Sequence, residues 1–104
     1  ISTGLKGYTE VPYSGTITGW TMLPDQSGSC VVDIWKTDYT GAPPTVANTI
    51  TGSAKPTLTS ANKAQSSTLT GWTTTVNAGD IIAFNVDSAT TITKMNFILK
   101  INRL

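Results

Sequence analysis

The chain has 104 residues, 38% of them hydrophobic, which is enough for one core, so we expect a single domain over residues 1–104. Charged residues are only 12% of the chain, the formal net charge is +1, and no basic run exists that would neutralise a row of phosphates. The longest apolar run, residues 81–84, is too short to span a bilayer. These features argue against nucleic-acid binding and against membrane insertion.

The polar residues are dominated by threonine, with 20 Thr and 9 Ser in the chain. The branched Cβ of threonine restricts χ1 and suits a pleated, half-buried surface, so this composition favours sheets. Disorder is the other interpretation of a Ser/Thr-rich chain, but three Trp, three Tyr and two Phe argue against it.

The first third of the chain predicts three strands. Residues 4–11 form an edge strand that Pro12 ends, because proline cannot donate a ladder hydrogen bond. Residues 13–23 form a second strand, closed by a turn over residues 24–28. Residues 30–36 form a third, with Cys30, Val32 and Ile34 on one face and Val31, Asp33 and Trp35 on the other. Asp33 is expected to point outward and to pair with a basic side chain.

Residues 38–68 predict a long irregular connection that contains Pro43, Pro44, Gly52 and Pro56. A connection of this length in a compact domain is usually functional or packed as a loop of its own. Residues 60–65 could form a short turn of helix, but they carry no extended apolar stripe.

The last third predicts three further strands linked by short turns. Residues 69–76 form a Thr-rich strand, and a turn at residues 77–80 leads into a strand over residues 81–86. A second turn at residues 87–90 precedes the clearest strand, where Met95, Phe97, Leu99 and Ile101 alternate with mostly polar residues. About six strands with a crossover predict an all-β, antiparallel two-sheet β-sandwich, jelly-roll-like in topology, with an immunoglobulin-like sandwich as the alternative.

The residue inventory predicts a protein that is not an enzyme and carries no cofactor or metal. The chain has no histidine, which excludes Ser-His-Asp and Cys-His catalysis and histidine-based zinc sites. The single cysteine, Cys30, excludes a thiolate cluster, and there is no glycine-rich phosphate loop. Asp25, Asp80 and Asp87 fall in predicted turns, where backbone capping is the expected role.

Aromatic residues are the remaining candidates for recognition. Trp20, Trp35 and Trp72 lie in predicted strands, so we expect them in the core. Asp38 and Tyr39 open the long polar connection, and a loop with one Tyr and one Asp has the composition of a glycan or protein contact. Asp38 and Tyr39 are therefore the predicted ligand-binding residues.

A resemblance to a known group of proteins is carried by residues 16–20, 31–36, 50–56, 69–72, 78–80 and 84–90. These stretches resemble the small C-terminal β-sandwich domains of bacteriophage tail-fibre, tailspike and other tail-associated virion proteins, and the resemblance covers nearly the whole chain, residues 4–101. It implies an extracellular virion location, the C-terminal part of a longer chain, a homotrimer, and contact with a host cell-surface glycan or protein. It supplies no ligand residues.

Three functions are thus expected to compete. The first is host-surface attachment by a phage tail domain, with a glycan as the ligand. The second is a purely structural module that trimerises or decorates the virion. The third is a carbohydrate-binding accessory module of a secreted enzyme.

Overall fold

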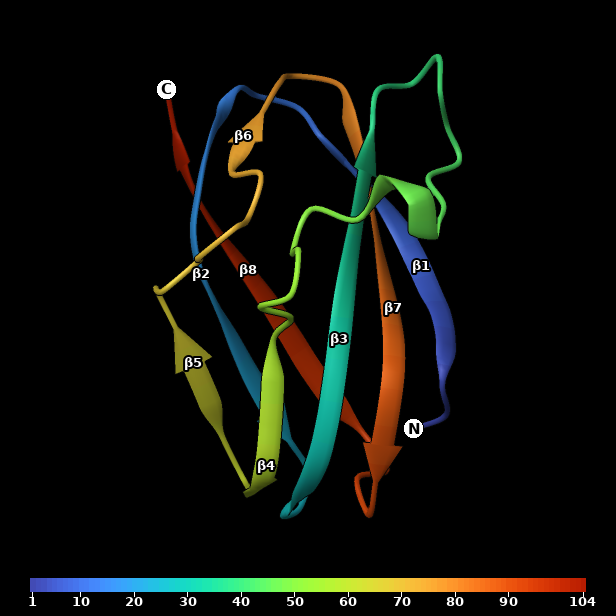
Figure 1. Cartoon of the computed structure of the whole chain (residues 1–104), viewed down its shortest axis with the longest axis vertical. Helices are drawn as coiled ribbons and strands as arrows, with labels where there is room; N and C mark the ends of the chain where they lie inside the picture. The colour runs from blue at the N-terminus through green and yellow to red at the C-terminus, as the bar shows by residue number, and fades with distance from the viewer.

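The computed structural model describes residues 1–104 as two antiparallel sheets packed face to face (Figure 1). Sheet A has the order β1 (Gly4–Val11), β7 (Asp80–Thr90), β3 (Gly28–Thr37) and β4 (Thr57–Ala61). In sheet B, β2 (Gly15–Pro24) pairs on one side with β8 (Met95–Arg103) and on the other with β5 (Ala64–Ser66) and β6 (Thr75–Val76). The prediction of an all-β two-sheet sandwich is confirmed.

The chain crosses from one sheet to the other at most of its connections. Of all strands that follow one another in the chain, only β3 and β4 pair with each other. Such alternation is jelly-roll-like, whereas an immunoglobulin-like sandwich keeps more of its successive strands, such as F and G, in one sheet.

Period-two alternation builds the core between the sheets. Met95, Phe97, Leu99 and Ile101 of β8 face inward and are half-buried, while the residues between them are exposed. The ring of Phe97 lies 5.4 Å from that of Phe84 and 6.4 Å from that of Trp20. Two buried clusters, one towards each end of the sandwich, complete the core: Trp20, Met22, Cys30, Val32, Leu58, Val86 and Ile92 in the first, and Val11, Ile17, Ile34, Ile50, Val76 and Ile82 in the second.

The strand predicted over residues 69–76 is mostly wrong, because only β6 is extended there. Gly71 has a φ of +79°, and the Trp72 amide donates to the Leu69 carbonyl at 3.1 Å, so the chain turns instead. The turn carries the Trp72 ring against both core clusters, and its Nε1 donates to the Ala54 carbonyl at 2.8 Å. Trp72 is therefore packed as expected, but from a loop and not from a strand.

The other two tryptophans differ from each other. Trp20 is buried in the first core cluster, as expected. Trp35 is only half-buried and belongs to neither cluster, because alternation along β3 turns it away from the side on which Ile34 is buried. The prediction of a core position for Trp35 is therefore wrong.

Two loop predictions are also corrected. Residues 38–68 are not irregular throughout, since they contain the 3₁₀ turn η1 (Val46–Asn48) and the strands β4 and β5, and residues 60–65 are not helical. Residues 87–90 are not a turn but the last part of β7, where Ser88 and Ala89 pair with Val31 and Cys30 of β3. Pairing with a long neighbouring strand outweighs the local preference of short polar residues for a turn.

One side of the sandwich is left open. There β1 pairs only with β7, and β8 pairs only with β2, so each is an edge strand, as predicted for β1. Between these edges lies a hollow of about 290 Å³ whose walls include Phe84, Leu99 and Ile101. The opposite side is covered by the crossing from β4 to β6 that contains Trp72.

Candidate functional site

The predicted recognition residues lie in a turn directly after β3. The Asp38 carboxylate oxygen Oδ1 accepts a hydrogen bond from the Gly41 amide at 2.8 Å, and the Ala42 amide donates to the Tyr39 carbonyl at 3.2 Å. These bonds fix the turn and leave the Tyr39 side chain 78% exposed. In turns, an Asp side chain commonly accepts a hydrogen bond from a backbone amide two or three residues later in the chain. Asp38 thus holds the turn that presents Tyr39.

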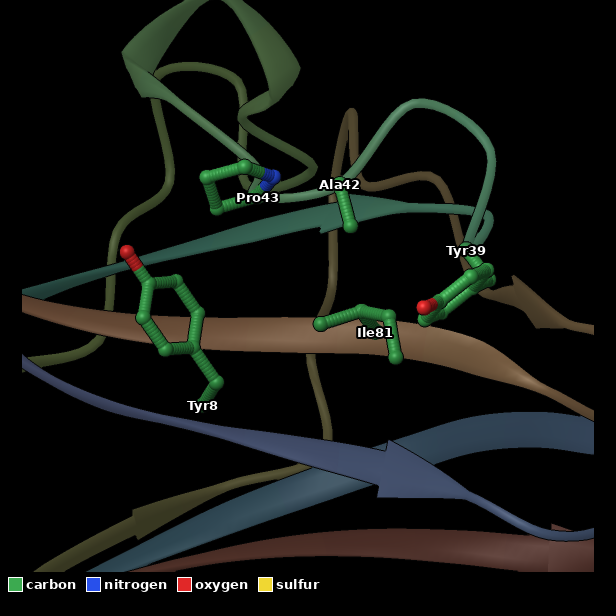
Figure 2. A pocket seen from close by; sticks show the side chains of 5 residues that line it. All are labelled: Tyr8, Tyr39, Ala42, Pro43 and Ile81. Carbon is green, nitrogen blue, oxygen red and sulfur yellow. The ribbon is translucent and has the colours of Figure 1, made fainter.

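Tyr39 forms one wall of a shallow, open depression of about 510 Å³ on the outer face of sheet A (Figure 2). Its other lining residues are Tyr8 from β1, Ile81 from β7, and Ala42 and Pro43 from the loop after β3. Figure 2 shows the two tyrosines on either side of Ile81, with Ala42 and Pro43 above it. We call this depression the tyrosine pocket.

Strand alternation explains how β1 and β7 supply the floor. Ile82 of β7 belongs to the core between the sheets, so Ile81 points to the outer face. Ala83 of β7 is likewise on the outer face, and Tyr8 of β1 pairs with it. The Tyr8 side chain is 51% exposed. The pocket therefore combines an apolar floor with two amphipathic rings, each of which offers a flat face and a hydroxyl.

Sequence reasoning placed Tyr39 at this site but missed Tyr8, Ala42, Pro43 and Ile81. Alternation alone could have put Tyr8 on one face of its strand. It could not show that β1 lies beside β7, because this pairing joins the first strand of the chain to the last but one. Asp38 does not line the pocket.

Asp33 is the second notable polar group on this face, and it points outward from its sheet, as expected. Asp33 is nevertheless only 1% exposed, because Thr49 and Thr51 of the segment after β3 lie against it. Its Oδ1 accepts from the Ile34 amide at 2.8 Å and from the hydroxyls of Thr49 and Thr51 at 2.6 and 2.8 Å. Its Oδ2 accepts from Trp35 Nε1 at 3.0 Å. Asp33 thus ties the connecting segment to β3.

Two opposing effects act on the pKa of Asp33. Burial raises it, but the hydrogen bonds from Thr49, Thr51, Trp35 and the Ile34 amide outweigh burial and hold the pKa below the ordinary 3.8. The expected basic partner is present, since Lys55 Nζ lies 3.9 Å from Asp33 Oδ2. Lys55 is closer to Asp87, at 2.6 Å, and the hydrogen bond to Asp87 is the main reason that the pKa of Lys55 is raised above 10.5.

The remaining chemistry-bearing residues form no centre. No group of three or more His, Cys, Asp or Glu side chains gathers to hold a metal ion. Cys30 is buried, and this burial raises the pKa of its thiol, which disfavours the reactive thiolate. No helix in the structure is long and apolar enough to cross a membrane.

The comparisons with known proteins add no relatives. The sequence matches no protein-family profile, no curated protein and no solved structure at a significant level.

Proposed function

We propose that this chain is a host-surface attachment domain of a phage tail protein and that it binds a glycan in the tyrosine pocket. The observation that carries the glycan assignment is the pair of exposed rings, Tyr8 and Tyr39, on either side of an apolar floor. A pyranose ring has an apolar face that stacks on an aromatic side chain, and its hydroxyls can bond to the phenol oxygens. The virion assignment rests on the sequence resemblance, which implies an extracellular location.

The site supports binding in preference to catalysis. The groups around the pocket are two phenols, three apolar residues and no carboxylate pair that could act as acid and base. The third expected function, an accessory module of a secreted polysaccharide-degrading enzyme, would use the same pocket. The sequence of the full parent polypeptide separates these two, because a catalytic domain upstream would indicate the enzyme module.

Replacing Tyr8 and Tyr39 tests the pocket directly. We expect Tyr8→Ala and Tyr39→Ala each to weaken glycan binding about tenfold, as is common when a central aromatic contact is truncated. A glycan array followed by titration of its best ligand provides the measurement, and binding to intact bacterial cells provides the second readout. Both side chains are exposed, so the melting temperature should not change.

Val46→Ala is the matched control, because Val46 is 66% exposed on the same connection and lies outside the pocket. It should bind like the wild type. No binding above background on the array and on cells would contradict the attachment function. Full binding by the double tyrosine variant would contradict the pocket.

A second candidate function, a structural virion module, is favoured by the open side of the sandwich. Two unpaired edge strands that border an apolar hollow are typical of a surface that pairs with another subunit. A homotrimer built through this side would leave the tyrosine pocket free, since the pocket lies on the outer face of sheet A.

A further inference from the structure

The charges of the strands are divided unevenly between the two sheets. The strands of sheet A carry four carboxylates: Glu10, Asp33, Asp80 and Asp87. The strands of sheet B carry none, but they contain Lys100 and Arg103, and Lys63 and Lys94 directly precede β5 and β8. The one carboxylate that flanks a sheet B strand is Asp25, directly after β2, so sheet B carries more basic residues than carboxylates.

These basic side chains are free to bind another anion. All three ion pairs of the structure use Lys36 or Lys55, which lie on the side of sheet A. Lys63 and Lys100 make no ion pair and are exposed. A field of one sign over a sheet face attracts ligands of the opposite charge and raises their association rate.

The same face is hollowed by the shape of β2. The pairing of β2 with β8 shifts register between Ile17 and Gly19, where a bulge leaves Thr18 unpaired. Gly19 lies on the outer face, and a Cβ there would come within 2.6 Å of the Ser66 carbonyl oxygen. Only glycine therefore lets β2 approach the Ser66 backbone this closely, and the absence of a side chain at Gly19 leaves a hollow on the outer face of sheet B.

Two adjoining hollows result, which we call the sheet B groove. The first, of about 300 Å³, has no apolar residue in its wall, which consists of Thr18, Gly19, Gln65, Ser66, Ser67 and Lys100. The second, of about 390 Å³, shares Gln65 with the first, and the rest of its wall consists of Thr21, Leu23, Lys63 and Ala64. Because the hollows share a wall residue, the groove suits successive units of a chain better than a single small molecule.

The polar groups of the groove are suited to sugar hydroxyls. Gln65 accepts a hydrogen bond from Thr21 at 3.5 Å through Oε1, which leaves its amide nitrogen to donate outward. The Ser67 hydroxyl and the Lys100 ammonium add further donors, and the Thr18 hydroxyl, which donates to the Lys100 carbonyl at 3.4 Å, can accept from a ligand. No aromatic ring lines either hollow, so a neutral sugar would lack a stacking surface and a nucleic acid would lack a platform for its bases.

We propose that the sheet B groove binds an acidic polysaccharide, with Lys63 and Lys100 attracting its carboxylates and with Gln65 and the neighbouring hydroxyls bonding to its sugar rings. This site uses other residues than the tyrosine pocket and lies on the opposite sheet, so it goes beyond the function proposed above. The two share only the general class of ligand.

Titration with fluorescent oligogalacturonate tests the groove. We expect binding that weakens as salt is added, because each ion contact releases counterions. Lys63→Gln/Lys100→Gln should bind about tenfold more weakly, with a shallower salt dependence. Gln65→Ala should weaken binding severalfold while leaving the salt dependence unchanged. Lys6→Gln, which removes one exposed charge from sheet A and none from the groove, is the charge control and should bind like the wild type.

Three further arms make the outcome decisive. A neutral oligosaccharide of the same length should not bind to the groove, and polyphosphate of matched charge should bind more weakly than oligogalacturonate. Equal or tighter binding of polyphosphate, or wild-type binding by the double lysine variant, overturns the proposal. Tyr8→Ala/Tyr39→Ala should retain oligogalacturonate binding. The experiment therefore distinguishes an error in the proposed tyrosine pocket from an error in the proposed sheet B groove.

Discussion

At the scale of single residues, Asp33 shows how a carboxylate can be buried at low cost. Its two oxygens accept four hydrogen bonds, from one backbone amide, one indole and two threonine hydroxyls. Hydrogen bonds to a charged acceptor are worth about 1.5–3 kcal/mol each, which offsets much of the loss of hydration. No buried side-chain nitrogen or oxygen in the protein is left without a partner. Asp33 therefore anchors the segment after β3.

Asp25 is the exposed counterpart of Asp33, at the turn between β2 and β3. Hydrogen bonds, first from the Thr93 side chain and then from the Lys94 amide, lower its pKa from 3.8 to about 2. The amides of Thr93 and Lys94 lie 3.2 and 3.1 Å from Asp25 Oδ1. These bonds link the turn after β2 to the turn that joins β7 and β8.

The lowered pKa values of Asp25 and Asp33 predict a loss of stability in acid. A carboxyl whose pKa is lower in the folded state stabilises the fold above the unfolded value, here 3.8, and this contribution disappears as the pH falls through the folded value. We therefore expect the melting temperature to be steady just above pH 3.8 and to fall as the pH drops from 3.8 towards about 2. Circular dichroism melts across this range provide the measurement.

Asp25→Asn is the control for the acid titration. It removes one of the two groups that bind a proton on unfolding, so its melting temperature should fall less steeply over the same range. A wild-type melting temperature that does not change between pH 3.8 and 2 would show that the hydrogen bonds to these carboxyls do not stabilise the fold.

At the scale of elements, β8 is the strand that sequence reasoning described best. Its alternation is regular, and the structure confirms both its position and its inward face. By contrast, the signal for a strand at residues 69–76 came from threonine content, which carries no alternation. Here the tertiary position of Trp72, packed against both clusters, decided the conformation.

The register of β8 can be tested with two aspartates. Phe97→Asp would place an unpaired charge between the rings of Trp20 and Phe84, and it should lower the free energy of unfolding by about 3 kcal/mol or more. Lys100→Asp changes an exposed outer residue and should alter it by no more than about 0.5 kcal/mol. Chemical denaturation of both variants gives the comparison, and equal stabilities would mean that the inward face has been misassigned.

At the scale of the whole molecule, the two sides of the sandwich differ. The crossing that carries Trp72 covers one side, while β1 and β8 leave the other with free edges and an apolar hollow. Exposed edge strands are sites for pairing with another chain unless they are protected. Cys30 is the only cysteine, so no internal disulfide reinforces the domain, and association would add stability.

If the chain is a structural virion module, we expect it to self-associate through the open side of the sandwich, between β1 and β8. Light scattering over rising protein concentration should give an oligomer, and Thr9→Lys should return it to a monomer that is still folded. Thr9 is exposed and lines the hollow, so a lysine there places a charge in the proposed contact surface. A strict monomer at high concentration would count against the trimerising function and would leave the attachment function unaffected.

The sequence by itself determined the class of the fold, the positions of β1, β2, β3 and β8, and the inward face of β8. These features depend on the geometry of one strand, in which neighbouring side chains point to opposite faces. Tertiary structure alone decided the burial of Asp33, the extension of β7 through residues 87–90, the meeting of Tyr8 with Tyr39, and the placement of Lys63 and Lys100 on one sheet. Each of these features joins residues that are far apart in the chain. The partner of each residue is set by the strand pairings that bury the most apolar surface while leaving every polar group hydrogen-bonded. No local sequence pattern contains this information.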